Sequence, residues 1–210
     1  MLYNYEDKRC PLFDEKMSSN TNILKNYLLP HMVKVKNEKE KQDLTSFFYV
    51  SSGFVSVYRK SEDVLLGHLH APIFFGVNYL YDVYFPVYFT GGAGTVIYKG
   101  DVGVLLKIIR ENHLEECLLY VMISNVNELY RRDLISVKSD SYQIIKSILL
   151  HYIDKPLDFR MQFGIASIII KLTGLSRSHV MRILSELKKG GYIETKEGKL
   201  ISVSDLPEKF

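Results

Sequence analysis

Cysteine and long apolar runs are scarce in this sequence, and each shortage excludes a class of protein. Two cysteines in 210 residues, Cys10 and Cys117, cannot form a disulfide framework or supply the four thiolates of an iron–sulfur cluster. No apolar run approaches the roughly 20 residues that cross a bilayer. The opening MLYNYEDKRC is polar, whereas a signal peptide needs an apolar stretch there. We therefore expect a soluble cytoplasmic protein that makes no membrane contact.

Net charge is also low, at +3, but it is unevenly distributed. From Ser139 to Phe210 the chain has eleven Lys and Arg residues against eight Asp and Glu, so the first 138 residues are neutral overall. Between Lys171 and Lys199 there are seven basic residues against three acidic ones. Only this C-terminal part is therefore matched electrostatically to nucleic acid. With 47% hydrophobic residues, the chain can hold one large or two modest domains.

The clearest local pattern lies between Leu172 and Ile201. Ser176 stands where a helix N-cap would stand, and its hydroxyl can accept a hydrogen bond from a free backbone amide. Apolar residues follow at i, i+3, i+4 and i+7 and predict one buried stripe on a helix: Val180, Ile183, Leu184 and Leu187. Gly190 and Gly191 predict the C-terminal end of this helix.

Two neighbouring segments complete the pattern. Upstream, IASIIIKLTG predicts a shorter buried helix that ends at Gly174, with only Leu175 before the Ser176 cap. Two helices joined by so short a turn with a glycine are typical of a helix-turn-helix. Downstream, GYIET and KLISV are two strand patterns with a short turn between them, and they predict a hairpin of the kind called a wing.

The outward face of the predicted helix suits duplex DNA. Arg177 and Arg182 lie on it, and an arginine can donate two hydrogen bonds to the O6 and N7 atoms of guanine. The alternative interpretation is a solvated basic face on an ordinary helical hairpin. The cap, the turn glycine, the arginine spacing and the wing together favour DNA binding. The predicted DNA-binding residues are Ser176, Arg177, Ser178, His179, Met181, Arg182, Ser185, Lys188, Lys189, Lys196 and Lys199.

The N-terminal half of the chain has a different texture. Residues 1–20 are polar and are expected to be loosely ordered, and 22–29 are expected to form a short helix stopped by Pro30. From about residue 47, short aromatic and β-branched runs alternate with Gly, Pro and Asp. Their regular spacing predicts an antiparallel sandwich or barrel of about eight strands.

A helical period returns at about Leu105 and predicts a long helix over 111–134. We interpret its apolar side as the contact with a second copy of the chain, and a single helix packed on its own domain is the alternative. The predicted dimer residues are Leu114, Leu118, Val121, Met122, Asn125 and Leu129. Another amphipathic helix follows over 139–154 and is closed by Pro156. The predicted domains are therefore 1–110, 111–138 and 139–210.

This order of elements resembles the Crp–Fnr superfamily of bacterial transcription regulators over nearly the whole chain. The segment FFYVSSGFVSVYRKSEDVLLGHLHAPIFFGVNYLYD looks like the first β-roll hairpins of the family, and GLSRSHVMRIL is similar to its recognition helix. The resemblance implies an α+β fold with an N-terminal antiparallel β-roll of the cyclic-nucleotide-binding type, a long dimerisation helix and a C-terminal winged helix-turn-helix. It also implies a homodimer on a roughly palindromic operator, with RNA polymerase as a candidate partner.

The same resemblance assigns roles within the recognition helix. Arg177, Ser178 and Arg182 take the base-reading positions, and Ser176 and His179 the adjacent backbone-contacting ones. The middle base-reading position is often Glu in the family, where it pairs with cytosine. Because Ser178 stands there, we expect a half-site sequence that differs from the familiar one.

The chain departs from the family where a cyclic nucleotide would bind. Such members place Glu just after the glycine of the GEL motif and an Arg with Ser or Thr several residues later. Here Val77 and Asn78 follow Gly76, and Tyr84–Thr90 contains no cation. A buried phosphate would lack a compensating charge. We therefore expect a degenerate site that binds no cyclic nucleotide, and no other cofactor.

Three further features have two interpretations each. His68 and His70 alternate on a predicted strand and face one side, as a metal pair would, but surface or core histidines are commoner and no third ligand is near, so we expect no metal. Cys117 fits a redox switch between subunits or, more simply, a small buried residue. The aromatics of Tyr79–Phe89 fit an unidentified apolar ligand in the roll or, by default, a filled core.

The chemistry-bearing residues do not assemble into a nucleophile, base and orienting group, so we do not expect an enzyme. The expected function is sequence-specific transcription regulation by a homodimer that works without cyclic nucleotide. The alternative is a small-molecule or partner-binding sensor protein with weak DNA affinity. Sequence-selective, salt-dependent retention of DNA separates the two.

Overall fold

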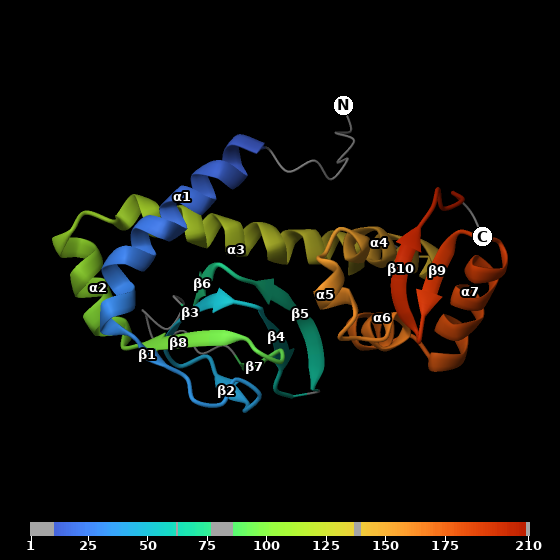
Figure 1. The fold of residues 1–210 in the computed structure, drawn as a ribbon, viewed down its shortest axis with the longest axis horizontal. Coiled ribbons are helices and arrows are strands. Elements are labelled where there is room, and N and C mark those ends of the chain that lie inside the picture. The colour runs from blue at the N-terminus through green and yellow to red at the C-terminus, as the bar shows by residue number, and fades with distance from the viewer. Residues whose placement is uncertain (1–10, 62, 77–85, 137–139, 209–210) are drawn as a thin grey trace. The chain divides into compact units, whose positions relative to one another are not determined.

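The computed structural model describes residues 11–61, 63–76, 86–136 and 140–208. The chain divides into two compact units, Met1–Glu128 and Leu129–Phe210, and the division falls within the long helix α3 (Glu115–Ser136). The first unit contains the β-strands that follow α1, and the second contains the helices and the hairpin that follow α3 (Figure 1).

The N-terminal unit is built on two antiparallel sheets (Figure 1). The strand order in the first sheet is β1 (Val33–Lys34), β8 (Val96–Gly100), β3 (Phe47–Ser52) and β6 (Ile73–Phe75). The order in the second sheet is β2 (Gln42–Asp43), β7 (Val87–Gly91), β4 (Phe54–Arg59) and β5 (Val64–His70). The expected antiparallel sandwich is confirmed for the part of this unit that the structure describes, but two of its strands, β1 and β2, precede residue 47, where the predicted strand runs begin.

Side chains from both sheets meet in a core between them. Phe48 of β3 packs edge-on against Phe89 of β7, with ring centroids 4.7 Å apart, and stacks on Phe75 of β6 at 5.5 Å. The buried members of this core are Phe48, Val50, Val55, Phe75, Phe89 and Ile97. Since successive strand residues face opposite sides, their neighbours in β3 and β6 point away from this core.

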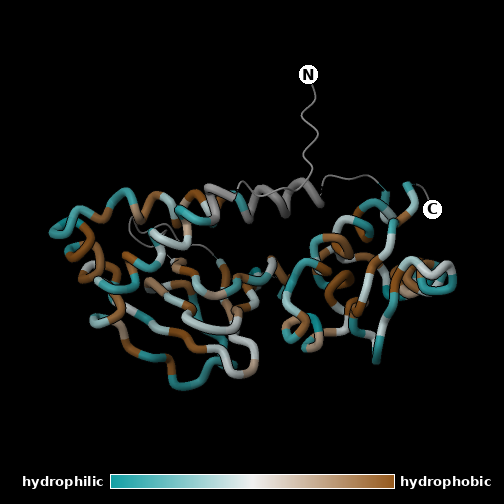
Figure 2. The backbone as a smooth tube through the Cα atoms, turned by 45° about the horizontal axis from the view of Figure 1, so that its top comes forward, coloured by the Kyte–Doolittle hydropathy of each residue, from teal (hydrophilic) through white to brown (hydrophobic). Residues whose placement is uncertain are grey.

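Those neighbours form a second core under three helices, α1 (Pro11–Leu28), α2 (Val102–Glu111) and the first half of α3. Its buried members are Leu24, Leu28, Met32, Phe47, Tyr49, Phe74, Leu105, Ile109, Leu114 and Val121. β3 is therefore buried on both faces, which explains its continuous apolar run from Phe47 to Val50. In Figure 2 the tube of this unit alternates between hydrophobic and hydrophilic residues along most of its strands and helices.

The N-terminal helix is longer than the sequence predicted. Residues 11–20, expected to be loosely ordered, form the first half of α1, which starts at a proline, a residue favoured in the first helical turn. Leu24 and Leu28 are fully buried and fix the second half of α1 to the core. The helix ends two residues before Pro30, as predicted.

The long helix also begins later than predicted. We expected one helix from residue 111, but 102–111 form the separate helix α2, and α3 starts at Glu115. Asp101 caps α2 by accepting a hydrogen bond from the backbone N–H of Val104 at 2.9 Å. His113, with φ 54°, turns the chain between the two helices. The apolar residues near Leu105 therefore belong to a short helix of their own.

The C-terminal unit consists of short helices and one hairpin (Figure 1). Its elements are α4 (Ser141–Ile153), α5 (Leu157–Arg160), α6 (Ile165–Thr173), α7 (Arg177–Lys189), β9 (Ile193–Lys196) and β10 (Lys199–Val203). The expected helix over 139–154 is α4, which Asp140 caps by accepting from the N–H of Tyr142 at 3.1 Å. Within the ranges given above, no helix is both long and apolar enough to span a membrane.

The C-terminal segment is tied to α4 through its backbone carbonyls. The Tyr142 hydroxyl donates to the carbonyl of Pro207 at 2.6 Å. Lys146 Nζ donates to the carbonyls of Leu206 and Pro207 at 3.0 and 2.9 Å. The residues that follow the hairpin are thus held on the first helix of the unit.

Candidate nucleic-acid interface

One apolar stripe fixes α7 to its domain. The buried residues are those that the sequence predicted: Val180, Ile183, Leu184 and Leu187. Ser176 Oγ accepts a hydrogen bond from the backbone N–H of His179 at 3.3 Å, so the predicted N-cap is confirmed. Gly191, with φ 73°, follows the C-cap Gly190, and this left-handed conformation ends the helix.

The turn between α6 and α7 contains three residues. Gly174 has φ 71°, a left-handed conformation that glycine adopts without strain and that closes α6 after Thr173. The Thr173 hydroxyl accepts a hydrogen bond from the backbone N–H of Leu175 at 3.1 Å. Since Ser176 already caps α7, the two helices are joined by the short glycine-containing turn of a helix-turn-helix, as predicted.

The predicted base-reading side of α7 points away from the domain core. Ser178, Met181, Arg182 and Ser185 each precede a buried residue of the stripe by two positions, and all four are exposed. An α-helix turns about 100° per residue, so Ser178, Arg182 and Ser185 lie on the side opposite the middle of the stripe, and Met181 lies on the flank beside them. This side of α7 is therefore free to enter a groove of DNA without disturbing the packing beneath it.

The two arginines of α7 are held differently. Arg182 Nη1 lies 3.8 Å from Glu186 Oε1, one turn later, and Arg182 Nη2 lies 3.5 Å from His179 Nδ1, one turn earlier. Arg177 is exposed and forms no hydrogen bond or ion pair with any residue that the structure describes. Arg182 thus has side-chain partners on its own helix, whereas Arg177 has none among the described residues.

The wing brings two lysines to the end of a hairpin. Lys196 and Lys199 are directly paired in the register of β9 and β10, with Glu197 and Gly198 between them at φ 52° and 77°. The Gly198 carbonyl accepts from the N–H of Ile165 at 2.9 Å, so the tip of the wing is tied to the first residue of α6. The wing is thereby attached to the helix that precedes α7.

Arg160 supports the hairpin from α5. Its Nη1 donates to the carbonyls of Leu200 and Ile201 at 2.9 and 2.8 Å, and its Nε donates to the carbonyl of Lys155 at 3.0 Å. No pattern in the sequence signals this role, because the contacts with the hairpin span about 40 residues and use only backbone acceptors on the other side.

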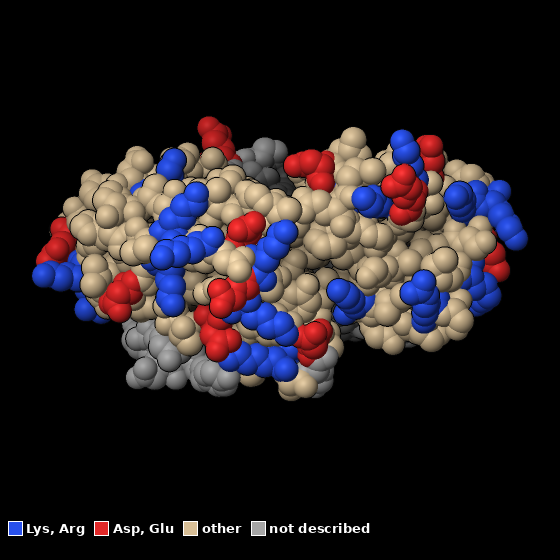
Figure 3. Space-filling view, turned by 60° about the horizontal axis from the view of Figure 1, so that its bottom comes forward, with Lys and Arg blue, Asp and Glu red and all other residues tan. Residues whose placement is uncertain are grey.

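None of the eleven predicted DNA-binding residues is buried. His179 and Lys199 are half-buried, and the other nine are exposed. Lys188 and Lys189 lie in the last turn of α7, where positive charge also stabilises the helix end. Figure 3 shows Lys and Arg side chains spread over the unit that carries α7, with fewer Asp and Glu among them.

Known proteins share both this domain and most of the chain. Residues 141–208 match the family described as "Winged helix-turn-helix DNA binding". The "Inhibitor of hydrogen peroxide resistance" of Escherichia coli (strain K12) is 30% identical over 164 residues, 78% of this chain and 79% of that protein. The protein of the same name from Salmonella typhimurium is 32% identical over 169 residues, 79% of this chain and 80% of that protein. The chain belongs to the same family as these two proteins.

Solved structures show that this family member has the Crp–Fnr fold. The c-di-GMP-responsive regulator CLP of Xanthomonas campestris has a TM-score of 0.67 at 15% identity, over 88% of this chain and all of that one. A CRP-family transcriptional regulator from Thermus thermophilus has 0.65 at 16% identity, over 82% and 92%. A CooA mutant from Carboxydothermus hydrogenoformans has 0.66 at 19% identity, over 85% and 86%. The predicted fold class and the resemblance to Crp–Fnr regulators are confirmed.

Several of the predicted dimer residues in and beside α3 are used within the subunit. Leu114 and Val121 are buried in the core under the first sheet, and Leu118 packs against that core. Asn125 Nδ2 donates to the carbonyl of Phe74 in β6 at 3.1 Å. Leu114 and Val121 are therefore buried within the subunit, and Leu118 and Asn125 are half-buried against its first sheet.

A second apolar stripe of α3 faces outward. Its members are Leu119, Met122, Ile123 and Val126, with exposed fractions of 54%, 42%, 41% and 60%. Met122 was among the predicted dimer residues, and the others were not assigned to that contact. The side chain of Leu129, also predicted there, lies outside those that the structure describes.

The positions at which the sequence departs from a cyclic-nucleotide site lie partly outside the described residues. Val77, Asn78 and 79–85 are not among those that the structure describes. In the described remainder, Tyr88 and Phe89 of β7 are buried, and Phe89 belongs to the core between the sheets.

His68 and His70 face one side, as predicted, because their β4 partners in the register are Ser56 and Phe54. His68 Nδ1 lies 2.9 Å from Ser56 Oγ. The described residues contain no group of three metal-ligating side chains.

Cys117 is half-buried against the core under the first sheet. Burial, and then the neighbouring Glu116, raise the pKa of its thiol, which disfavours the reactive thiolate. This environment favours the interpretation of Cys117 as a small packing residue.

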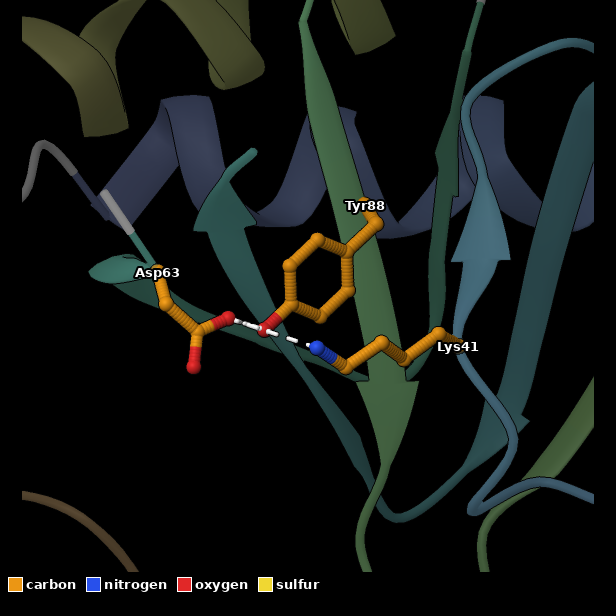
Figure 4. A network of polar contacts seen from close by, with 3 residues as sticks. All are labelled: Lys41, Asp63 and Tyr88. Atoms are coloured by element: carbon orange, nitrogen blue, oxygen red, sulfur yellow. Dashed lines mark hydrogen bonds and ion pairs between the residues drawn. The ribbon is translucent and has the colours of Figure 1, made fainter. Parts of the chain in front are cut away.

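A polar cluster that the sequence did not signal lies on the second sheet. Figure 4 shows the Tyr88 side chain between Asp63 and Lys41. The Tyr88 hydroxyl donates to Asp63, and Lys41 Nζ lies 3.4 Å from Asp63 Oδ1 and 4.3 Å from the centre of the Tyr88 ring. Burial, and then the bond to Asp63, raise the pKa of Tyr88. The cluster ties the β4–β5 hairpin to the segment before β2.

Proposed function

We propose that the protein is a sequence-specific transcription regulator that reads duplex DNA with α7. The observation that carries this proposal is the division of α7 into two opposite sides. Four buried apolar residues fix one side to the domain, whereas Arg182 is exposed on the other side and Arg177 is exposed at the first residue of the helix. A bidentate arginine–guanine pair contributes roughly 1–3 kcal/mol of base discrimination. The lysines of the helix end and of the wing supply phosphate contacts.

The regulator works as a homodimer joined through the outward stripe of α3. Leu119, Met122, Ile123 and Val126 recur at i, i+3, i+4 and i+7, the spacing of a two-helix seam. A second copy of the same helix presents the same stripe, so a two-fold contact buries both at once. This assignment replaces Leu114, Leu118 and Val121, which the subunit uses itself.

Dimerisation predicts the form of the operator. Two α7 helices related by a two-fold axis enter successive major grooves, about 34 Å apart, so the operator is roughly palindromic. Binding by two half-sites together also raises the affinity well above that of one half-site.

DNA binding by this protein does not require a cyclic nucleotide. Support comes from the sequence, since positions 77 and 78 are Val and Asn and Tyr84–Thr90 contains no cation. The described part of β7 adds that Phe89 fills the core between the sheets. Regulation then depends on protein abundance, on an apolar ligand in the roll, or on a protein partner such as RNA polymerase.

The regulated genes include some that limit survival in hydrogen peroxide. This part of the proposal rests on the 30–32% identity to relatives whose name states that effect. A host strain that lacks the protein should survive a peroxide challenge better than its parent, and wild-type protein supplied in trans should restore sensitivity. The Arg182→Ala variant should fail to restore it. Equal survival of all four strains would contradict a role in peroxide resistance.

Selection on genomic fragments tests the DNA-binding proposal against a ligand sensor with weak DNA affinity. Purified protein should retain a small set of fragments that share one palindrome, and retention should decrease with rising salt as phosphate contacts are screened. Retention without sequence preference at every salt concentration would favour the sensor. Lys107→Ala is the matched control for the basic residues, because Lys107 is an exposed lysine on α2, in the N-terminal unit.

A further inference from the structure

The wing has an irregularity in the middle of β10. Its pairing with β9 shifts by one residue between Leu200 and Ser202, so Ile201 has no partner on β9. Such an extra residue is a β-bulge, which bends its strand and increases the local twist. Lys199, which pairs with Lys196 at the end of the hairpin, lies just before the bulge. The direction in which the hairpin end carries these two lysines therefore depends on the shape of the bulge.

Arg160 binds the backbone carbonyls at this bulge. Its Nη1 donates to the carbonyls of Leu200 and Ile201 at 2.9 and 2.8 Å, while its Nε donates to the carbonyl of Lys155 at 3.0 Å. Consecutive carbonyls of a regular strand point to opposite edges, so one nitrogen atom can reach both here because the strand is bulged. The N–H groups of a guanidinium have fixed directions in one plane. The three bonds together therefore hold the bulge in one shape beside α5.

The wing lysines depend on the hairpin backbone for their placement. Lys196 is exposed and Lys199 is half-buried, and neither forms an ion pair with a residue that the structure describes. The turn between them is attached at one point, where the Gly198 carbonyl accepts from the N–H of Ile165 at 2.9 Å. Arg160 supplies the second attachment, on the strand that leaves the turn.

We propose that Arg160 is a positioning residue for DNA binding, which holds the wing so that Lys196 and Lys199 reach the phosphates. The side chain of Arg160 is half-buried and donates to backbone carbonyls, so it acts through the wing and not by a contact of its own with DNA. The inference rests on the proposed function and specifies what places the wing for its part in it.

Arg160→Met tests this role, because it removes the donors and keeps a long unbranched side chain. For each wing-lysine contact that is lost, operator affinity at about 0.15 M salt should fall about fivefold, the factor that a salt slope of about −0.9 per contact gives. The salt slope itself should flatten by about one per contact. The preference for the guanine assigned to Arg182 should stay as in the wild type, because α7 is fixed by its own apolar stripe.

A double-mutant cycle shows whether Arg160 acts through the wing. In protein that already carries Lys196→Ala and Lys199→Ala, Arg160→Met should cause no further loss of affinity. Affinities are compared per active protein, counted by stoichiometric titration below the melting temperature, so that a loss of folded protein does not enter them.

Lys146→Met is the matched control. Lys146 Nζ also donates to two consecutive backbone carbonyls, those of Leu206 and Pro207, but these follow the hairpin. This variant should lower the melting temperature and leave the salt slope of DNA binding unchanged. Arg160→Lys keeps the charge and loses the planar fork, so it should show the pattern of Arg160→Met in smaller size, and it replaces that variant if Arg160→Met does not fold.

The proposal is overturned if the Arg160 variants keep the wild-type affinity and salt slope, or if their loss of affinity persists undiminished without the wing lysines. It is also overturned if Lys196→Ala with Lys199→Ala binds the operator as the wild type does. Each of these results leaves sequence-specific reading by α7 in place. A wild-type protein that selects no operator at all would instead contradict the proposed function.

Discussion

Arg182 and Glu186 form an ion pair on the outer side of α7, with 3.8 Å between Nη1 and Oε1. Their side chains are 60% and 44% exposed, so solvent screens the pair and its contribution to stability is small. The pair bears on the proposed function, because it involves the guanidinium group that we propose for base reading. On our proposal, Arg182 exchanges this carboxylate for a guanine when the protein binds DNA.

Glu186→Gln should therefore tighten DNA binding. The substitution removes a negative charge near the phosphates and frees Arg182, and we expect an affinity gain of about two- to fivefold at low salt that shrinks as salt rises. The free energy of unfolding should change by less than about 0.5 kcal/mol. Glu111→Gln is the matched control, because Lys107 and Glu111 form an ion pair of the same spacing and distance, 3.8 Å, on α2. Weaker binding by Glu186→Gln in a fluorescence titration would contradict this role of the pair.

Arg182→Ala should cost about 1–3 kcal/mol per half-site and relax the preference for guanine at one position. Lys188→Ala and Lys189→Ala should instead weaken binding to all sequences alike and reduce the salt slope by about one each. Mobility-shift titrations on operators with each single base change distinguish the two patterns. Unchanged affinity and preference in Arg182→Ala would remove this residue from the base-reading set.

The dimer contact gives opposite predictions for two valines of α3. Val126→Glu, at an exposed position of the outward stripe, should leave the fold intact and give a monomer in sedimentation, because two charges would otherwise meet in an apolar seam. Val121→Glu should instead destabilise the N-terminal unit, since Val121 is only 2% exposed within the subunit. Val104→Glu, at an exposed valine of α2, is the control and should remain a dimer. A wild-type monomer that binds a full palindrome would contradict the dimer.

Two tyrosines of α4 should respond differently to loss of the hydroxyl group. Tyr152 is 4% exposed and its hydroxyl has no hydrogen bond partner among the described residues, so Tyr152→Phe should leave the melting temperature unchanged or raise it. The Tyr142 hydroxyl donates to Pro207, so Tyr142→Phe should cost about 1 kcal/mol. Calorimetry of the two variants measures both changes in stability. A large loss of stability in Tyr152→Phe, without one in Tyr142→Phe, would mean that the Tyr152 hydroxyl forms a hydrogen bond and would contradict this prediction.

The same tyrosine, Tyr152, gives a pH dependence. Burial raises the pKa of Tyr152 well above its usual range. A folded-state pKa above the unfolded value contributes stability that is fully present below the unfolded pKa of about 10 and is lost as pH rises beyond it. Tyr152→Phe should lessen the loss of stability above about pH 10, as measured by denaturant titration.

The recognition helix could be predicted from the sequence because everything that defines it is local. The Ser176 cap, the four apolar positions and the terminal glycines lie within sixteen residues, and each acts on its near neighbours. The same holds for the wing, whose turn is set by Glu197 and Gly198. In such segments, propensity, capping and burial all favour one structure.

The orientation of α3 could not be predicted in this way. Its sequence carries two apolar stripes, one through Leu114 and Val121 and another through Leu119 and Val126, and periodicity does not say which one covers the sheet. That choice depends on Phe47 and other strand residues far away in the chain. The Lys41–Asp63–Tyr88 cluster is hidden for the same reason, because tertiary structure alone brings these residues together.

The most direct test of the account is a titration of the selected palindrome with purified protein, first without any nucleotide and then with millimolar cAMP or cGMP. We predict tight, sequence-selective binding of two subunits per palindrome without nucleotide, and the same affinity after either nucleotide is added. Binding that appears only when cAMP or cGMP is present, or binding that does not distinguish the palindrome from scrambled DNA, would contradict it.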